Sequence, residues 1–239
     1  MLRRRMDAII DKLQTLGELP AADKSLIKTV LNDIRLIGAR KDILREGDRP
    51  THVHLLVSGW CCRYNIVVNG ARQITAFLLP GDLCNSRATL LRQMDHGIST
   101  LTPAKVAFIA PSDMDELLAR PLIARALWLA GLVDESALRA WVISLGKRDA
   151  AGRVAHLICE LFVRLGIAGN TRPDGFDLPL TQEELGDALG LTPVHVNRVV
   201  RHLREAGMMS IKNRTVEITD FPKLQKAAGF DSGYLHAIG

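Results

Sequence analysis

Two short helical patterns in the segment 180–209, separated by a glycine, form the part of the sequence best suited to recognise a nucleic acid. Thr181 is a predicted N-cap, and Glu184 follows three residues later, which is the spacing of a capping box. Gly190 predicts the end of this first helix, because glycine tolerates the left-handed conformation found at helix C-termini. This pattern predicts a helix-turn-helix, whose second helix enters the major groove of DNA.

The second helix is predicted to begin at Thr192, with Pro193 in its first position, where the missing N–H costs nothing. Its apolar face, suited to anchoring in a core, consists of Val196, Val199, Val200 and Leu203. Its other face carries Val194, Asn197, Arg198 and Arg201. Arginine suits guanine O6 and N7, and asparagine suits adenine, so this face predicts contacts with base edges and phosphates.

A basic hairpin is predicted directly after the second helix. Met209–Ile211 and Val216–Thr219 flank Lys212-Asn213-Arg214, which is typical of the wing of a winged helix. His195 adds a group able to contact either a phosphate or a base. The candidate DNA-binding residues are therefore Thr181, Thr192, Pro193, Val194, His195, Asn197, Arg198, Arg201, Lys212 and Arg214.

The overall charge favours a polyanionic partner without identifying it. The 239 residues carry a net charge of +5, and the isoelectric point is about 9.2. Residues 147–239, however, hold 12 basic and 11 acidic side chains, so their net charge is only +1. The prediction of DNA binding therefore depends on where a few basic side chains lie, and not on bulk charge.

The composition is that of a globular protein, with 47% hydrophobic and 24% charged residues. The length suits one large or two modest domains. Neither a signal peptide nor an apolar run of the ~20 residues needed to cross a membrane is visible, so the expected location is the cytoplasm. No nucleophile–base arrangement, P-loop or GxGxxG motif is present in the sequence, so an enzyme is not expected.

The cysteines Cys61, Cys62, Cys84 and Cys159 form neither a CxxC motif nor a zinc-finger pattern. Buried thiols are favoured over a reactive or metal-binding role. Trp60-Cys61-Cys62 favours a β core with one thiol inside over a sensor cavity. His52 and His54 alternate on a predicted strand, and solvent-facing side chains are favoured there over a metal or haem site.

The N-terminal half changes from helical to β-prone periodicity. Residues 6 to about 37 are predicted to be helical, with interruptions at Gly17 and Pro20. Short β-prone segments separated by turn residues follow, from Ala39 to a last strand at Lys105–Ala110. Asn69-Gly70 predicts a type I′ hairpin. The pattern indicates a β-sandwich or jelly roll.

A long amphipathic helix of about 25 residues is predicted after this β segment, with Pro121 interrupting it or beginning its main part. Such a helix exceeds what a small β domain needs for cover, so a dimer interface is favoured over simple packing on its own sheet and the next domain. Trp128 and Trp141 are assigned to that interface or to interdomain packing. Gly146 is the expected hinge, followed by a helix at Arg148–Leu165. A short strand is expected at Phe176–Leu180.

A jelly roll, a long helix, a hinge and a winged helix-turn-helix, in this order, resemble the CRP/FNR family of bacterial transcription regulators. Leu79-Pro80-Gly81-Asp82 and the segment 146–155 strengthen the resemblance. The resemblance implies an α+β homodimer, in which an effector-sensing jelly roll and dimerisation helix (residues 1–146) precede a promoter-binding winged helix-turn-helix domain (residues 147–239). It also implies RNA polymerase as a partner that is recruited or blocked.

The sequence departs from the family's sensor patterns. Cyclic-nucleotide binders carry a Gly-Glu-Leu element and an Arg-Ser or Arg-Thr pair, whereas this chain has Ser86 at the glutamate position and His96-Gly97 at the position of the pair. A cyclic phosphate needs a fixed positive charge, so cyclic AMP binding in the usual way is not expected, although Arg87 lies in the same stretch. The N-terminal cysteine cluster of the iron–sulfur members is also missing from the sequence. The effector is unidentified, and its candidate residues are Trp60, Cys62, Cys84, Arg87 and His96.

The second helix departs from the family as well. Val194 stands where family members commonly place a glutamate that accepts from cytosine, while Arg198 matches the family's arginine. We therefore expect a palindromic operator that keeps a guanine contact but differs from sites read through glutamate. The alternative function is a cyclic-nucleotide or small-ligand binding module that acts through protein contacts. The arginines of the second helix and the basic wing favour the DNA-binding regulator.

Overall fold

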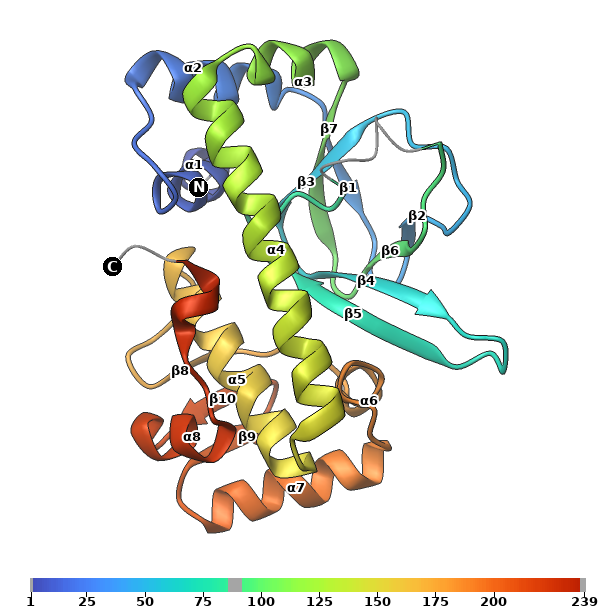
Figure 1. The fold of residues 1–239 in the computed structure, drawn as a ribbon, viewed down its shortest axis with the longest axis vertical. Coiled ribbons are helices and arrows are strands. Elements are labelled where there is room, and N and C mark those ends of the chain that lie inside the picture. The colour runs from blue at the N-terminus through green and yellow to red at the C-terminus, as the bar shows by residue number, and fades with distance from the viewer. Residues whose placement is uncertain (1, 86–91, 237–239) are drawn as a thin grey trace. The chain divides into compact units, whose positions relative to one another are not determined.

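The computed structural model describes residues 2–85 and 92–236, and Figure 1 shows their helices and strands. Ser86 and the candidate effector residue Arg87 lie outside the described residues. The chain divides into two compact units. The first holds Met1–Ile66 and Thr75–Asp134, and the second holds Val67–Ile74 and Glu135–His236.

Two helices and a strand begin the first unit. Helices α1 (Leu2–Gln14) and α2 (Ala21–Val30) are followed by strand β1 (Ile34–Ile37). The prediction that residues up to about 37 are helical was therefore wrong for 31–37, because α2 ends at Val30 and Ile34–Ile37 is a strand. Ile34–Ile37 pairs antiparallel with β7 (Ala104–Ile109), with Ile34 opposite Ala107. Pairing with a strand about 70 residues away overrides a local spacing that suits a helix.

The first unit contains two sheets, as expected for a jelly-roll-like β domain (Figure 1). One has the order β1-β7-β3, and the other has the order β2-β6-β4-β5. Their remaining strands are β2 (Asp42–Leu44), β3 (Val53–Ser58), β4 (Cys61–Ile66), β5 (Arg72–Leu78) and β6 (Gly97–Thr100). Side chains such as Leu56, Cys61, Ile98 and Val106 form a buried core cluster of this unit.

A second core cluster joins helices to the sheet that contains β3 and β7. It includes Leu13 of α1, Ile27 of α2, Leu55 of β3 and Ile109 of β7. Helices α3 (Pro111–Leu118) and α4 (Pro121–Lys147) contribute to the same cluster. Burying each such leucine or isoleucine contributes about 1.5–3 kcal/mol, so these helices are tied to the sheet by apolar contact.

The hairpin between β4 and β5 lies where the sequence predicts it, but its turn is of another type. A type I′ turn requires positive φ at both central residues. Here Gly70 has φ +83°, whereas Asn69 is not in the left-handed region. Gly70 N donates to Val67 O at 2.8 Å, and Val67 N donates to Ala71 O at 2.9 Å. The loop is therefore longer than a two-residue hairpin and places its left-handed residue last.

Helix α4 spans 27 residues and begins at Pro121, so this proline starts the main helix and does not interrupt it. The helix continues through Gly146, the expected hinge, to Lys147. Asp149 then caps the next helix by accepting from Gly152 N at 2.7 Å. The break between these helices thus lies at residues 148–149. The two compact units divide within α4, after Asp134, and the domain boundary at residue 146 stays a prediction.

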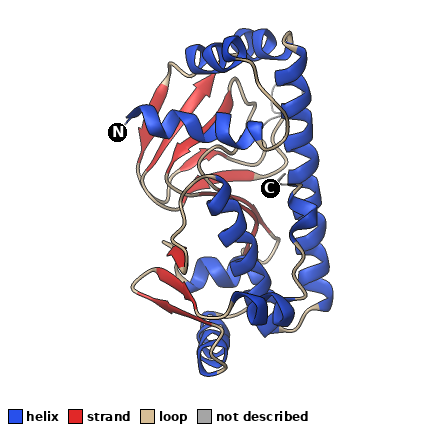
Figure 2. Cartoon of the chain, turned by 90° about the vertical axis from the view of Figure 1, so that its left-hand side faces the viewer, coloured by secondary structure: helices blue, strands red, loops and turns tan. Residues whose placement is uncertain are grey.

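The second unit is built around helix α5 (Ala150–Ile167), which is buried along much of its length. Its other elements are β8 (Gly175–Asp177), α6 (Gln182–Leu189), α7 (Pro193–Glu205), β9 (Met209–Lys212), β10 (Thr215–Ile218), α8 (Phe221–Ala228) and the 3-10 helix η2 (Ser232–Leu235). The sheet order is β8-β10-β9, and strands are red in Figure 2. Strand β8 is shorter and begins earlier than the predicted Phe176–Leu180, because its pairing with β10 starts with Gly175 opposite Glu217 and ends with Asp177 opposite Thr215.

The buried faces of these elements meet in an apolar core. Val196, Val199 and Leu203 of α7 are buried, as are Phe176 of β8 and Leu224 of α8.

No helix among the residues that the structure describes is long and apolar enough to span a membrane.

Candidate nucleic-acid interface

Helix α6 begins and ends as its sequence predicts. The Thr181 hydroxyl oxygen accepts from Glu184 N at 3.1 Å, and the Glu184 carboxylate accepts from Thr181 N at 2.7 Å. These two hydrogen bonds complete the capping box. Gly190 has φ +63° at the C-cap, which confirms the predicted stop. The Thr181 side chain is therefore occupied as a cap and is only half-exposed.

The turn between α6 and α7 depends on a glycine that the sequence analysis did not single out. Gly186 lies inside α6, and a Cβ atom there would overlap the carbonyl oxygen of Leu191. Leu191 N in turn donates to Gly186 O at 3.1 Å. The backbone of the turn thus approaches α6 closely enough to exclude any side chain. A glycine inside an otherwise helical pattern was the available signal.

Helix α7 has the two faces that the sequence predicts. Thr192 is the N-cap and accepts from His195 N at 3.2 Å, with Pro193 in the first turn. The predicted apolar face is buried, with Val200 half-buried. The predicted contact face is exposed, as are the residues of the first turn; these are Thr192, Pro193, Val194, His195, Asn197, Arg198 and Arg201.

This exposed face is free to bind an anion. Neither Arg198 nor Arg201 has an acidic partner among the described residues, and no acidic residue occurs in α7 before Glu205. Its basic groups point to solvent, while the N-terminus of the helix adds a partial positive charge. The arrangement can therefore donate to base edges and phosphate oxygens without first breaking an ion pair.

The wing carries the tight turn that the sequence analysis expected elsewhere. Asn213 and Arg214 both have positive φ, +49° and +59°, as a type I′ turn requires. They join β9 to β10, and Lys212, Asn213 and Arg214 are all exposed. Arg214 O accepts from Leu178 N at 2.8 Å, which ties the wing to the segment after β8. The turn is well placed to present basic side chains beside α7.

Two basic residues outside α7 hold the helix-turn-helix in place through hydrogen bonds to its backbone. Arg153 of α5 donates through Nη1 to Leu189 O at 3.2 Å and through Nε to Arg148 O at 3.0 Å. Lys223 of α8 donates to Ala206 O, at the C-terminal end of α7, at 2.7 Å. These hydrogen bonds satisfy carbonyl groups that a helix end leaves open. The sequence analysis missed both, because the partners lie far apart in the chain.

The candidate effector residues of the first unit are engaged in separate local interactions. Trp60 packs edge-on to Phe77, and Cys62 Sγ lies 3.4 Å from Ser99 Oγ. His96 Nδ1 lies 2.6 Å from Asp95, and its buried Nε2 has no hydrogen-bond partner among the residues that the structure describes. Cys84, the last of the described candidates, belongs to the apolar cluster that holds Leu56 and Ile98. Each described candidate is thus held by a local contact of its own.

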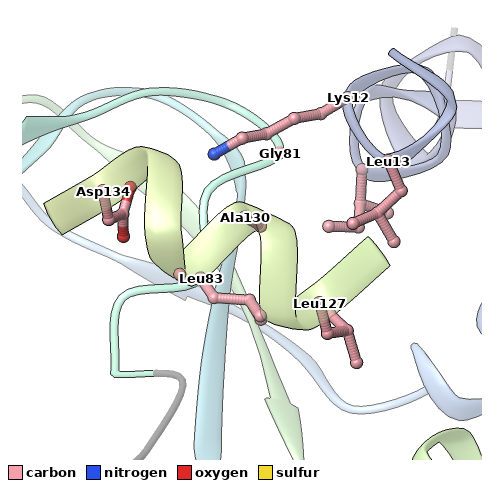
Figure 3. A pocket seen from close by; sticks show the side chains of 9 residues that line it. Lys12, Leu13, Gly81, Leu83, Leu127, Ala130 and Asp134 are labelled. Atoms are coloured by element: carbon pink, nitrogen blue, oxygen red, sulfur yellow. The ribbon is translucent and has the colours of Figure 1, made fainter. Parts of the chain in front are cut away.

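A small cavity in the first unit is lined by other residues. Figure 3 shows Leu13, Leu83 and Leu127 around it, with Lys12 and Asp134 at its edge. Lys12 Nζ pairs with Asp82 at 2.6 Å, and Asp134 accepts from Arg63 at 3.0 Å. Its other lining residues are apolar or glycine, and the two charged side chains at its edge already have partners of opposite charge, which disfavours binding of a charged effector.

The residues at the family's arginine position do not fit a cyclic phosphate. His96 stands at the arginine of the family's pair, and Gly97 stands at its serine or threonine; a Cβ atom at Gly97 would overlap the ring of Tyr64, so a hydroxyl side chain fits there only if that ring moves. Arg63, a nearby cation, already donates to the carbonyl oxygens of Leu83 and Cys84 at 2.8 and 3.0 Å. Ser86, at the glutamate position, lies outside the described residues.

Two expectations about buried groups of this unit were wrong. The first was that one thiol of Cys61 and Cys62 would be inside, whereas both are fully buried. Burial raises the pKa of Cys61 and raises that of Cys84 to about 12, which disfavours the reactive thiolate. The second was that His54 would face solvent.

His54 is buried, and its ring packs edge-on to Phe108 with centroids 4.5 Å apart. Its backbone N donates to the side chain of Asn85 at 2.6 Å. Burial lowers the pKa of His54 to about 4, because it penalises the charged imidazolium. His52 is half-exposed, so the two alternating histidines differ in environment.

The tryptophans of α4 also differ. Trp128 is 74% exposed, whereas Trp141 is buried and donates through Nε1 to Glu160 at 3.0 Å. Trp141 therefore packs within the second unit, against α5. Trp128 stays available for the interface that the sequence analysis assigned to it.

Comparison with known proteins agrees with this architecture. Residues 152–227 match the model of the Crp-like helix-turn-helix domain, and residues 35–121 match that of the cyclic nucleotide-binding domain. The transcriptional activator protein FnrL of Cereibacter sphaeroides is 29% identical over 199 residues, covering 81% of this chain and 79% of FnrL. The fumarate and nitrate reduction regulatory protein of Vibrio cholerae is 25% identical over 190 residues, covering 79% of this chain and 76% of that protein.

Solved structures show the same fold. The structure of FixK2 from Bradyrhizobium japonicum superposes with a TM-score of 0.74 at 22% identity, covering 83% of this chain and 98% of FixK2. The two domain matches, the relatives and the shared fold together show that the chain belongs to the CRP/FNR family of DNA-binding transcriptional regulators.

Proposed function

We propose that this protein acts as a homodimer on a palindromic operator, with α7 in the major groove of each half-site and the β9–β10 wing against the phosphate backbone. The exposed face of α7 carries the proposal, because its arginines are unpaired among the described residues and its first turn is open to solvent. A helix presented in this way by a helix-turn-helix is the established means of reading base edges.

The chemistry of each side chain assigns it to a base edge or to a phosphate of the DNA. Arg198 is assigned to guanine, since a guanidinium can bond O6 and N7 together, and Asn197 is assigned to adenine. Arg201, Lys212 and Arg214 are assigned to phosphates, because they extend from the end of the contact face and from the wing. The near-neutral charge of residues 147–239 makes these few side chains decisive.

The exposed apolar side chains of α4 support the proposed dimer. Ile123, Ala126 and Trp141 are buried on one side of the helix. Large apolar side chains on the remaining surface are exposed, and these are Leu122, Trp128, Leu132, Leu138, Val142 and Ile143. Six large apolar side chains exposed on one helix form more apolar surface than the single exposed residues that are normal on a monomer. Packing against the same helix of a second copy would cover this surface.

The remaining assignments follow from this role. Residues 1–146 would sense an effector or redox signal that is not identified, and residues 147–239 would bind the promoter. RNA polymerase is the proposed partner that is recruited or blocked. Because the proposed ligand is promoter DNA, the proposed location of the protein is the bacterial cytoplasm.

The dimer can be tested by replacing Trp128 with glutamate and measuring the mass in solution by sedimentation. We expect the wild type to be a dimer at micromolar concentration and the variant to dissociate, because a charge would replace an apolar side chain that is 74% exposed in the single chain. Arg139→Ala on the same helix, which removes an exposed ion pair with Glu135 and an exposed hydrogen bond to Ser136, is the matched control. A monomeric wild type would refute the proposal.

The DNA contacts can be tested by selecting operators with the full chain and measuring the affinity of Arg198→Ala at several salt concentrations. Loss of a bidentate guanine contact should cost about 1–3 kcal/mol and relax the sequence preference at one position of each half-site. Arg172→Ala, an exposed arginine paired with Asp177 in the same unit, should leave affinity unchanged. If Arg198→Ala weakened specific and non-specific binding equally, Arg198 would contact phosphate only. If the wild type selected no sequence, a ligand-binding module acting through protein contacts would replace this proposal.

A further inference from the structure

One side chain on the contact face of α7 is apolar. Val194 is 69% exposed, and it is the single exposed large apolar side chain among the described residues that follow α4. We propose that Val194 reads the 5-methyl group of a thymine in each operator half-site. This inference rests on the proposed function and names what the helix recognises.

The position of Val194 suits contact with a base edge. It lies in the first turn of α7, and the N-terminal residues of a recognition helix are those that reach base edges. Thr192 caps this turn by accepting from His195 N, and Pro193 restricts its backbone. Valine in a helix strongly prefers one rotamer, so its methyl groups are held in place before binding.

The chemistry of the face excludes other uses of this position. Val194 can neither donate nor accept a hydrogen bond, whereas an apolar side chain complements the methyl group that thymine presents in the major groove. Cytosine presents an N4 donor there and needs an acceptor such as a carboxylate. Since α7 holds no acidic residue before Glu205, nothing on this face supplies one. Valine therefore favours thymine by contact, and the lack of an acid removes the preference for cytosine.

The neighbours of Val194 limit where the thymine lies. Asn197 and Arg198 follow at i+3 and i+4 and share its face. Four residues of helix rise by about 6 Å, which is close to the separation of one or two base-pair steps. The thymine should therefore lie within about two base pairs of the guanine read by Arg198.

Replacing thymine by deoxyuridine tests this inference, because it removes the methyl group and leaves the hydrogen-bonding edge of the base intact. Each thymine of the selected operator is replaced in turn in both half-sites, and affinity is measured by fluorescence anisotropy at one salt concentration. Burial of one methyl group corresponds to about a fourfold change in affinity, so one position should show about a fourfold loss per half-site. Other thymines should show none.

Val194→Ala then links the effect to the residue. This variant should bind the thymine operator more weakly and should no longer distinguish thymine from deoxyuridine at that position. His202→Ala, at an exposed position of the same helix that is not among the candidate DNA-binding residues, is the matched control and should retain the full distinction. Because Val194 is exposed, we expect the circular dichroism and melting temperature of the variant to match those of the wild type.

Three results would overturn the inference. The selected half-site could lack a preferred thymine near the guanine read by Arg198, the wild type could be indifferent to deoxyuridine at every position, or Val194→Ala could keep the full distinction. In each case the protein would still bind its operator specifically, so the proposed function would stand. Loss of all sequence preference in the wild type would instead refute both.

Discussion

Replacing Tyr234 with phenylalanine tests how the C-terminal segment is attached to the second unit. The Glu160 side chain is 0% exposed and accepts hydrogen bonds from elements that are distant in sequence. Its Oε2 atom accepts from Tyr234 O–H at 2.9 Å and from Trp141 Nε1 at 3.0 Å. Its Oε1 atom accepts from Arg164 at 3.1 Å. Glu160 thus joins η2, the end of α4 and α5 at one carboxylate.

The structure sets the expected magnitude. Tyr234→Phe removes one hydrogen bond to a buried carboxylate, which contributes about 1.5–3 kcal/mol. The ring itself remains, stacked on His156 with centroids 5.9 Å apart, so the apolar packing is preserved. Burial and the neighbouring Glu160 raise the pKa of the Tyr234 hydroxyl, so it is the donor at neutral pH. We therefore expect the second unit to lose about 1.5–3 kcal/mol of unfolding free energy.

The other tyrosine of the chain is a matched control. Tyr64 in the first unit donates to Asp42 at 2.8 Å, but at an exposed position. Tyr64→Phe should therefore change stability by only about 0.5 kcal/mol or less. Because the chain has two units and need not unfold in one step, hydrogen exchange of α5 amides should be measured beside urea denaturation.

The relative size of the two effects decides the outcome. If Tyr234→Phe cost no more than Tyr64→Phe, the buried carboxylate would not hold the C-terminal segment, and the reasoning would fail. Glu160→Gln should exceed either change, at about 3–5 kcal/mol, because it leaves Arg164 without its buried carboxylate. A smaller loss for Glu160→Gln than for Tyr234→Phe would also contradict this account.

Three other outcomes follow from the structure. Burial lowers the pKa of His54 and of His156 to about 4, so the unfolded chain binds more protons than the folded chain between about pH 6.5 and 4. The unfolding free energy should therefore be highest above this range and should fall within it by up to about 3 kcal/mol per histidine. Urea denaturation at several pH values measures this, and a pH dependence that His156→Gln did not flatten would contradict it. Gly186→Ala should destabilise the helix-turn-helix and abolish operator binding, whereas Gly146→Ala, with nothing within 4 Å of its Cβ position, should be neutral or stabilise by up to about 1 kcal/mol in thermal melts. The four cysteines are all buried, so a thiol reagent should label them only as fast as the chain opens, and rapid labelling of the folded protein would refute this.

The sequence by itself was sufficient for the helix-turn-helix, because the signals there act over a few residues. The capping box at Thr181 and Glu184, the left-handed stop at Gly190 and the cap at Thr192 each join groups within four positions of one another. Helical periodicity then separated the buried from the exposed face of α7. Such interactions form within the segment itself, so local spacing predicts them well.

Features that depend on distant partners required the tertiary structure. Ile34–Ile37 has a spacing compatible with a helix and became a strand only by pairing with β7. The type I′ turn lies at Asn213-Arg214 and not at Asn69-Gly70, since the backbone around each hairpin decides which residues take positive φ. His54 is buried because Phe108 and Asn85 cover it.

The division between these two groups has a physical reason. Caps and helix stops satisfy backbone groups that a helix end leaves open, and the residue types able to do so are few. Burial and long-range hydrogen bonds depend on which surfaces meet, as Glu160 shows with partners 19 and 74 residues away. Residue types and local spacing alone therefore determined that α7 presents Val194, Asn197 and Arg198 together. Only the folded chain decided that Gly186 has no room for a side chain and that Trp141 and Tyr234 share one carboxylate.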